Sequence, residues 1–313
     1  MADCRYSSRA YAGHLDLQAM LGLLRQRQPG RASDFPGFID LQEMLAIPKI
    51  QAAARLWNDP DGRLAGFAIL DRYPSSASLI FEIVSGLKDN ELENQVLAWA
   101  EAAIQSAIPA PVDTFLLESN TSSDDLERII LLERLGFEQL DAGAFHLERS
   151  LADPIAQPQL PEGFMIRPIG GEQEAEDWVR LHRTALGTQT MTTEYKLAMM
   201  RLPTYDPQMD LVTVAPDGRL AAYCVCFINV EENTLSGQRN GYTDPVATHP
   251  DFQRRGLAKA LLLTGLSLLK ERGMRSVRLG TSSANFAMLR TAESVGFRIK
   301  KKVFFYRKPI HFT

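Results

Sequence analysis

The second half of the chain switches between the hydrophobic spacing of strands and that of helices. Apolar or alternating runs predict strands at residues 164–169, 210–215, 219–228, 239–249 and 275–281. Apolar residues that recur every three or four positions predict helices at residues 172–186, 192–202, 257–272 and 286–295. A last pair of strands is expected before residue 310. The pattern therefore predicts a mixed α/β domain whose central, mostly antiparallel sheet is flanked by helices.

Particular side chains are expected in the core of this domain. In the helix over 172–186, the helical spacing places Trp178, Leu181 and Leu186 on the inner side. In the strand over 219–228, Cys224 and Cys226 are two residues apart and so face the same side, where they are expected to pack as small apolar residues.

Two segments of the first half reappear, in the same order, in the second half. Asp-Gly-Arg-Leu before an apolar strand occurs at 61–64 and again at 217–220, about 156 positions later. A helix end, Gly-Phe and a predicted strand pair occur at 131–150 and again at 291–310, about 160 positions later. We therefore expect two tandem domains of one type, over 1–150 and 164–313, joined by a Pro-rich linker at 151–163.

Composition narrows the class of protein without identifying it. The chain has 313 residues, 45% of them hydrophobic, and a net charge of −4, which argues against a nucleic-acid partner. The three cysteines and five histidines show no disulfide framework and no metal-ligand spacing, so we expect neither metal nor disulfides. With no signal-peptide pattern at the N-terminus and no apolar run long enough for a membrane span, a cytoplasmic protein without membrane contact is predicted.

The stretch HPDFQRRGLAKALL, residues 249–262, is typical of an anion-binding site. A helix predicted from Leu257 follows a strand directly, and Arg254, Arg255 and Gly256 lie at its N-terminus. Helix N-termini offer unpaired N–H groups and the positive end of the helix dipole, where arginines are otherwise unfavourable. The junction therefore predicts a phosphate or pyrophosphate site, and the absence of GxGxxG and GxxxxGK[ST] excludes the common dinucleotide and P-loop motifs.

These residues resemble the GCN5-related N-acetyltransferases, whose acetyl-CoA loop reads [Q/R]-x-x-G-x-[G/A]. The loop here is Gln253-Arg254-Arg255-Gly256-Leu257-Ala258, and it follows a strand that ends V-x-x-x-P at residues 246–250. Asn285, a short helix and Gly296-Phe297 follow in the family's order. The resemblance covers the second domain, and the duplicated architecture is similar to that of tandem acetyltransferases.

The resemblance implies which residues bind acetyl-CoA, the expected co-substrate. Backbone amides from Gln253 to Lys259 would hold the pyrophosphate, the strand backbone at 246–248 would pair with the pantetheine arm, and Asn285 would bond nearby. The implied cofactor-binding residues are Val246, Ala247, Thr248, Gln253, Arg254, Arg255, Gly256, Leu257, Ala258, Lys259 and Asn285. The implied chemistry is direct attack of an amine on the thioester, whose carbonyl a strand N–H polarises.

The catalytic residues are less clearly indicated. The family often places a tyrosine, the acid for the leaving thiolate, where this chain has Ala292. Tyr306 is a candidate replacement, with packing as the alternative. Tyr242 and Asp244 share a strand face, and Asp244 is a candidate for accepting the proton of the amine, with a structural strand-end role as the alternative.

The first copy lacks the basic loop. Asp89, Glu91 and Glu93 stand in the corresponding place and would repel a pyrophosphate, so we expect that the first domain does not bind CoA. The predicted function is transfer of an acetyl group from acetyl-CoA to a small-molecule amine. A non-catalytic acyl-CoA binding or sensing protein and a purely structural second domain are the alternatives, and a homodimer is left open.

Overall fold

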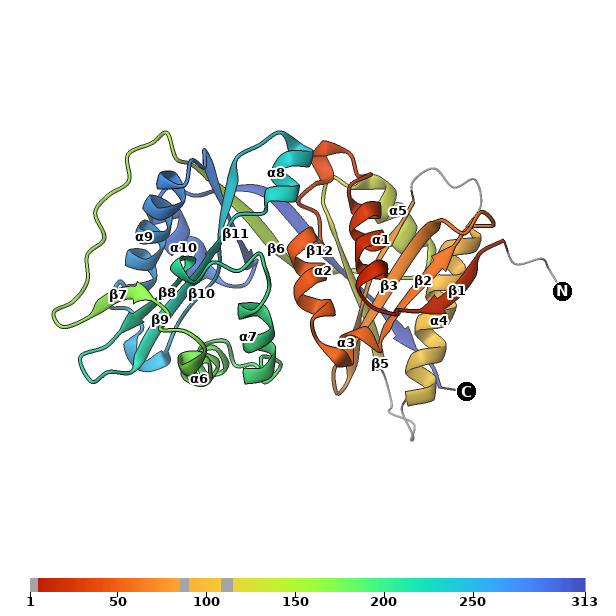
Figure 1. Ribbon diagram of the computed structural model, residues 1–313, viewed down its shortest axis with the longest axis horizontal. Helices are drawn as coiled ribbons and strands as arrows, with labels where there is room; N and C mark the ends of the chain where they lie inside the picture. Colours follow the sequence, from red (N-terminus) through yellow and green to blue (C-terminus); the bar gives the residue numbers. More distant parts are fainter. Residues whose placement is uncertain (1–4, 85–89, 108–114, 313) are drawn as a thin grey trace. The chain divides into compact units, whose positions relative to one another are not determined.

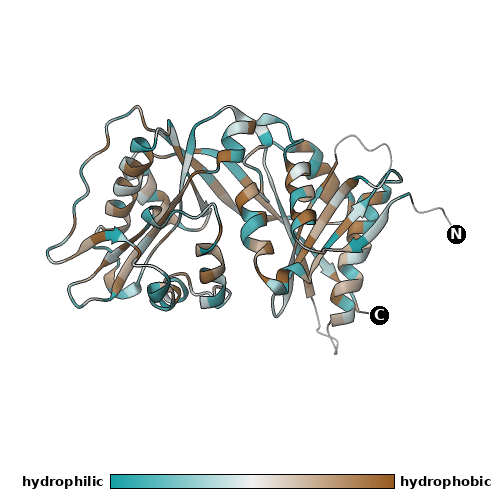
Figure 2. Cartoon of the chain, viewed as in Figure 1, coloured by the Kyte–Doolittle hydropathy of each residue, from teal (hydrophilic) through white to brown (hydrophobic). Residues whose placement is uncertain are grey.

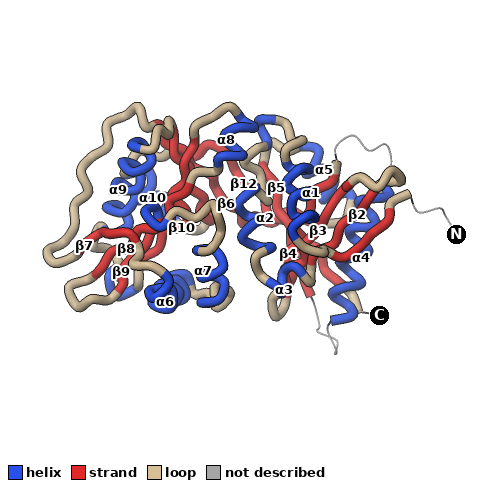
Figure 3. Tube along the Cα trace, viewed as in Figure 1, coloured by secondary structure: helices blue, strands red, loops and turns tan. Residues whose placement is uncertain are grey.

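The computed structural model describes residues 5–84, 90–107 and 115–312 (Figure 1). Its contacts divide the chain into two compact units, one of residues 1–143 with 303–313 and one of residues 144–302. Each unit combines strands and helices, red and blue in Figure 3, around its own hydrophobic core. The predicted α/β class, with a mostly antiparallel sheet flanked by helices, is confirmed.

The first unit contains a sheet in the order β1-β2-β3-β4-β5-β12. Neighbouring strands are antiparallel except β4 and β5, which run parallel. The elements up to the end of the first repeat are β1 (Ser7–Ala10), α1 (His14–Leu24), a 3-10 turn (Pro29–Arg31), α2 (Phe38–Leu45), α3 (Pro48–Gln51), β2 (Ala54–Asn58), β3 (Leu64–Arg72), β4 (Ser76–Ile83), α4 (Glu91–Ala107), β5 (Phe115–Ser122), α5 (Leu126–Arg134) and β6 (Glu138–Ser150).

The second unit contains a sheet in the order β6-β11-β10-β9-β8-β7, in which only β10 and β11 run parallel. The elements are β7 (Met165–Pro168), a 3-10 turn (Glu172–Glu174), α6 (Ala175–Leu186), α7 (Thr193–Met200), a 3-10 turn (Pro207–Met209), β8 (Asp210–Val214), β9 (Leu220–Phe227), α8 (Val230–Ser236), β10 (Asn240–Thr248), a 3-10 turn (Pro250–Phe252), α9 (Leu257–Glu271), β11 (Ser276–Ser282), α10 (Phe286–Ser294) and β12 (Arg298–Ile310).

Helices cover both faces of the sheet of the second unit. The leucines of α9 pack on one face against Cys224 and Cys226, which are buried as predicted (Figure 2, brown residues along α9). Trp178 and Leu181 of α6 pack on the other face with Tyr223. Gly265 permits the close approach of α9, because a Cβ there would lie 2.7 Å from the Cys226 sulfur. The side chains of β9 thus alternate between an α9 face and an α6 face.

Three expectations about local structure need correction. Leu186, expected on the inner side of its helix, is 48% exposed because it lies at the end of α6, where no strand covers it. The segment after Gly296-Phe297 forms one continuous strand, β12, instead of a strand pair, and β6 does the same in the first repeat. Helix α8 was not predicted, although Asn229 caps it by accepting from the Glu232 amide, a signature visible as Asn-x-x-Glu.

The ends of the two sequence repeats are exchanged between the compact units. The last residues of the first repeat, Ala144 to Ser150, pair with β11 in the second unit. The last residues of the second repeat, Val303 to Ile310, pair with β5 in the first unit. The unbroken strands β6 and β12 therefore each begin in one unit and end in the other, whereas the predicted domains were cut at residues 150 and 164.

Within the described residues, no helix has the length and apolar character that a membrane crossing needs, and no group of three or more metal-ligating side chains comes together.

Candidate functional site

Strand β10 separates from its parallel neighbour at the centre of the second unit. It pairs with β11 only from Asn240 to Tyr242, opposite Ser276 to Arg278. On its other side it stays paired with β9, with an irregularity between Thr243 and Val246 where β10 has one residue more than β9. In the described structure, Val246, Ala247 and Thr248 therefore have no strand on the β11 side, and an extended ligand can pair with that edge.

The loop after β10 forms a backbone cradle at the start of α9. Arg254 has φ 60° and Gly256 has φ 82°, so two left-handed residues occur within three positions. A left-handed arginine costs about 1–3 kcal/mol and is usually retained where function needs it. Alternating backbone conformations of this kind turn successive N–H groups toward one point, and the N-terminus of α9 adds its own N–H groups there.

The cradle carries positive charge that the protein does not neutralise. The side chains of Gln253, Arg254 and Lys259 are exposed, and neither Arg254 nor Lys259 forms an ion pair with any described residue. Nothing lies within 4 Å of the position that a Cβ on Gly256 would take, so the space in front of the loop is open. The geometry and the charge both suit an anion.

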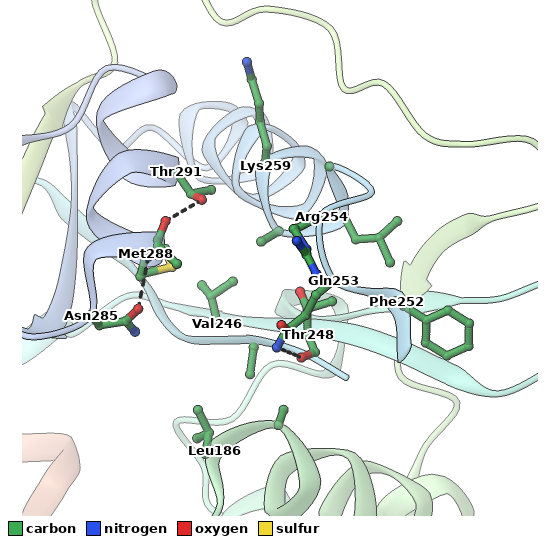
Figure 4. Close-up of a pocket in the computed structure, with 16 residues that line it drawn as sticks. Leu186, Val246, Thr248, Phe252, Gln253, Arg254, Lys259, Asn285, Met288 and Thr291 are labelled. Atoms are coloured by element: carbon green, nitrogen blue, oxygen red, sulfur yellow. Dashed lines mark hydrogen bonds between the residues drawn. The ribbon is translucent and has the colours of Figure 1, made fainter. Parts of the chain in front are cut away.

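A cavity of about 340 Å³ extends from the cradle along the open edge of β10 (Figure 4). It brings together every predicted cofactor-binding residue except Arg255. The guanidinium of Arg255 instead lies 6.0 Å from the Phe164 ring and 5.8 Å from the Phe252 ring, so its side chain is not part of the cavity wall. Figure 4 shows that the Lys259 ammonium is directed away from Val246, toward the outside.

Asn285 lines the cavity but also has a structural task. Its side-chain oxygen accepts from the Met288 amide at 3.1 Å and so caps α10. The side-chain N–H₂ group and the second lone pair of this oxygen are left for the ligand contact that the family resemblance implies.

Sequence reasoning missed several residues of the cavity wall. They come from the end of α6, the loop before α9 and the first turns of α10, namely Ala185, Leu186, Phe252, Ala287, Met288 and Thr291. These residues become neighbours only through tertiary packing, and no pattern in the sequence indicates that they belong together.

Tyr242, predicted as a catalytic candidate, is held in a buried hydrogen-bond network. Its hydroxyl donates to Glu232 Oε2 at 2.6 Å, and Arg278 donates to Glu232 Oε1 at 2.8 Å and to Glu148 Oε2 at 3.2 Å. The Tyr242 ring stacks on Phe227 with 4.6 Å between centroids. Burial and the Glu232 charge raise the pKa of Tyr242, so its hydroxyl stays protonated and acts here as a donor to a carboxylate.

Asp244 lies where β10 and β11 separate. Its Oδ2 accepts from the Gly280 amide of β11 at 3.0 Å. The carboxylate therefore faces the gap between the two strands, next to the open edge of β10. This position is compatible both with the predicted role in accepting a proton and with a structural role in holding the two strands.

Tyr306 and Ala292 lie away from the gap between the strands. The Tyr306 side chain is buried in the core of the first unit, where its hydroxyl donates to Gln139 at 3.3 Å. The end of β12 belongs to the first unit, which favours the packing alternative, and a catalytic role of Tyr306 stays a prediction. Ala292 is fully buried in the core beneath α10.

A second polar cluster, which the sequence did not indicate, lies beneath α6 and α7. Lys196 of α7 forms an ion pair with Asp210, and both side chains are almost completely buried. Asp210 also accepts from Tyr205, and the Lys196 ammonium lies 3.8 Å from the centre of the Trp178 ring.

The N-terminus of α4, which corresponds to the cradle in the first unit, is acidic. Glu91 and Glu93 lie in its first turn, and Asp89 lies outside the described residues. Glu91 accepts from the Arg5 amide, and Glu93 lies 3.5 Å from the Arg134 guanidinium. Both carboxylates therefore form contacts within the protein. That this unit does not bind CoA remains a prediction.

Comparison with known proteins finds one family match and several similar relatives. Residues 175–297 match the model of the acetyltransferase (GNAT) family. A mycothiol acetyltransferase of Thermobispora bispora is 29% identical over 170 residues, and the match spans 52% of this chain and only 56% of that protein. The mycothiol acetyltransferase of Nocardia farcinica is 29% identical over 286 residues, which are 85% of this chain and 86% of that protein.

A solved structure supports the fold over the whole chain. A tandem GNAT protein from the clavulanic acid biosynthesis pathway superposes with a TM-score of 0.71 at 16% identity, and the superposition covers 98% of this chain and 99% of that one. At this identity the likeness concerns the fold alone. Together with the family match, it confirms the predicted resemblance and the predicted enzyme class.

Proposed function

We propose that this protein transfers an acetyl group from acetyl-CoA to a primary amine of a small molecule, with residues 175–297, which match the GNAT acetyltransferase model, as the domain that does so. One observation carries this proposal. The anion cradle and the open β10 edge line one cavity, and Asp244, which does not line it, lies two residues before that edge on the same strand. A CoA thioester needs this sequence of contacts, namely charge for its pyrophosphate, a strand edge for its pantetheine arm and a polar end for its reacting group.

The residues of the chain divide these tasks between them. The amides from Gln253 to Lys259 would hold the pyrophosphate, and the backbone of Val246 to Thr248 would pair with the pantetheine. A β10 N–H directed at the open edge would polarise the thioester carbonyl and stabilise the oxyanion that develops there.

The acceptor would approach the α6 face of the gap, which is acidic. Asp244, Glu232 and Glu148 contribute three carboxylates there, and Arg278 contributes one compensating charge. An excess of negative charge in a partly buried site attracts a protonated amine.

The reaction forms a C–N bond and breaks a C–S bond. The ammonium group of the acceptor loses a proton, its lone pair attacks the carbonyl carbon, and the thiolate of CoA departs and takes a proton. Asp244 is the carboxylate next to the open edge of β10, so the amine would lose its proton close to this side chain. The thiolate finds no tyrosine at position 292, so solvent supplies its proton.

Ala292 also favours a second candidate function, a protein that binds an acyl-CoA without turnover. It occupies the position of the family's acid, and its methyl side chain, which is buried in the core, has no acidic proton to donate. A binding protein would use the same cradle as the enzyme and would differ only in lacking acetyl transfer. Measurements of CoA affinity and of turnover therefore separate the two functions.

The test begins with CoA affinity by titration calorimetry, in the wild-type protein and in Gly256→Val. We expect micromolar binding that weakens at least tenfold in G256V, because a β-branched residue disfavours the left-handed backbone of the cradle. Gly218→Val is the matched control, since Gly218 has φ 85° and open space around it but lies in the β8–β9 turn. Equal affinity in wild type and G256V would contradict the cradle.

Turnover is then measured as thiol release from acetyl-CoA with a panel of small primary amines. The name of the relatives adds the non-acetylated form of mycothiol to this panel, and because this acceptor is itself a thiol, its acetylation is followed by mass spectrometry. Amine-dependent thiol release that G256V loses supports the enzyme. Tight CoA binding without thiol release from any amine supports the binding protein.

A further inference from the structure

One histidine of the first repeat lies in the sheet of the second unit. His146 belongs to the part of β6 that pairs with β11, where it stands directly opposite Gly280. Antiparallel partners direct their side chains to the same face of the sheet. Because Val277 and Leu279 pack on the α9 face, Gly280 and His146 face the opposite side, toward the proposed acceptor.

Gly280 shows that His146 and Asp244 converge. A Cβ on Gly280 would lie 2.8 Å from Asp244 Oδ2 and 3.9 Å from His146 Cδ2. The carboxylate thus occupies the space that any other residue at 280 would fill, and the imidazole borders the same space. Asp244 Oδ2 and His146 Cδ2 are therefore at most 6.7 Å apart, the sum of these two distances, on one face of the strand that lies between β10 and β6.

The neighbouring row of side chains supports this pair. Next to it on the same face, Tyr242, Arg278 and Glu148 lie side by side on β10, β11 and β6, and Glu232 of α8 bonds to the first two. The charged and titratable groups of this row are therefore Asp244, Arg278, Glu148, Tyr242 and Glu232. On its other side β6 borders β12, which carries Lys300, Lys301 and Lys302 in the same unit.

We propose that His146 accepts the proton of the amine acceptor, with Asp244 as the carboxylate that stabilises the imidazolium. This inference rests on the proposed function. An imidazole has an ordinary pKa of about 6.5 and a carboxylate one of about 4, so the imidazole is the better matched base for an ammonium group near neutral pH. A neighbouring carboxylate also raises the proton affinity of an imidazole.

The ammonium group, the imidazole, the thioester and solvent account for every proton and bond in this step. The ammonium proton moves to the imidazole, directly or through one water, and the nitrogen lone pair forms the new C–N bond. The C–S bond breaks, the thiolate takes a proton from solvent, and the imidazolium releases its proton to solvent. The second repeat thus takes its base from the last strand of the first repeat.

The pairing is tested without any acceptor. Histidine side-chain NMR titrations, with His146 assigned from the His146→Gln spectrum, give the pKa of His146 in the wild-type protein and in Asp244→Asn. We expect D244N to lower this pKa by about one unit, since it removes the neighbouring charge. An unshifted His146 would overturn the pairing, whatever the activity.

The proton role is tested by the pH dependence of kcat/KM for acetyl transfer in wild type, H146Q and His14→Gln. We expect H146Q to lose about 100-fold or more and to lose the acidic limb of the profile, while its CoA affinity is unchanged and H14Q behaves like wild type. A wild-type rate and profile in H146Q would overturn the proton role. Failure of the wild-type protein to bind CoA would instead overturn the proposed function, which the calorimetry reports separately.

Discussion

At the scale of single residues, the core beneath strand β10 contains polar groups that must stay neutral. His182 of α6 and Tyr223 of β9 share a hydrogen bond of 2.8 Å, and Tyr223 stands opposite Ala247 in the sheet. Burial, followed by the charges of Lys196 and Arg183, lowers the pKa of His182 to about 4. The imidazole is therefore uncharged at neutral pH, and the α6 face beneath the cavity is held by a neutral pair.

Stability should fall when this histidine is forced to charge. Its pKa is lower in the folded protein than the ordinary 6.5, so the unfolded chain binds more protons between pH 6.5 and 4. We expect the free energy of unfolding to drop over this range by about 1–3 kcal/mol more in wild type than in His182→Gln. Urea titrations from pH 7 to 4 measure this, and H14Q should keep the wild-type dependence. Parallel curves for wild type and H182Q would refute the assignment.

At the scale of elements, α7 is fixed to the sheet by one buried ion pair. Lys196 reaches Asp210 at the start of β8, and Tyr205, in the turn that follows α7, donates to the same carboxylate oxygen at 2.9 Å. The side chains of Lys196 and Asp210 are 1% and 0% exposed. A buried charge whose partner is lost is strongly unfavourable, so the position of α7 depends on this pair.

Lys196→Ala should therefore destabilise the protein by about 3–5 kcal/mol, because Asp210 would keep a buried charge without its cation. Arg201→Ala removes a cation close by in the sequence, whose pair with Glu172 is exposed on the surface and screened by solvent, and should cost far less. Chemical denaturation of the two variants gives the comparison. Losses of similar size would show that the buried pair does not anchor α7.

At the scale of the whole molecule, the exchanged strand ends make each compact unit depend on both sequence repeats. The first unit uses Val303 to Ile310 as the neighbour of β5, and this segment carries the buried side chains of Tyr306 and Ile310. The second unit uses Ala144 to Ser150 as the neighbour of β11. Neither repeat contains all the strands of one unit.

A chain that ends at Lys302 should lose order in the first unit, although it lacks only residues of the second repeat. Hydrogen exchange at the amides of β5 should accelerate by about 100-fold or more, since these groups lose their partners in β12. Amides of β9 and β10 are the internal control and should keep their protection, because their ladders lie within residues 144–302. Equal protection of β5 with and without the segment would contradict the exchange.

Much of the local structure and of the cradle follows from the sequence. Helical spacing predicted α6, α7, α9 and α10, because a helix that covers a sheet must repeat its apolar residues at its own period. Arg254, Arg255 and Gly256 predicted an anion site, because the backbone conformation and the charge of a short loop depend on residues that are adjacent in the sequence. Cys224 and Cys226 were assigned to one face by strand period alone, and both are buried there.

What the sequence could not determine is which residues from distant segments meet. Tyr306 was a candidate catalytic residue with packing as the alternative, and it lies in the core of the first unit, whereas His146 was one of five scattered histidines and borders the same space at Gly280 as Asp244. Both assignments depend on the exchange of strand ends, which leaves the hydrophobic pattern of each strand unchanged. The amino-acid sequence was enough to predict the hydrophobic periods of helices and strands, the turns and the loop of the expected anion site. Each of these features depends on residues that are neighbours in the chain. The tertiary structure decided the partners of each strand, since pairing depends on the path of the whole backbone.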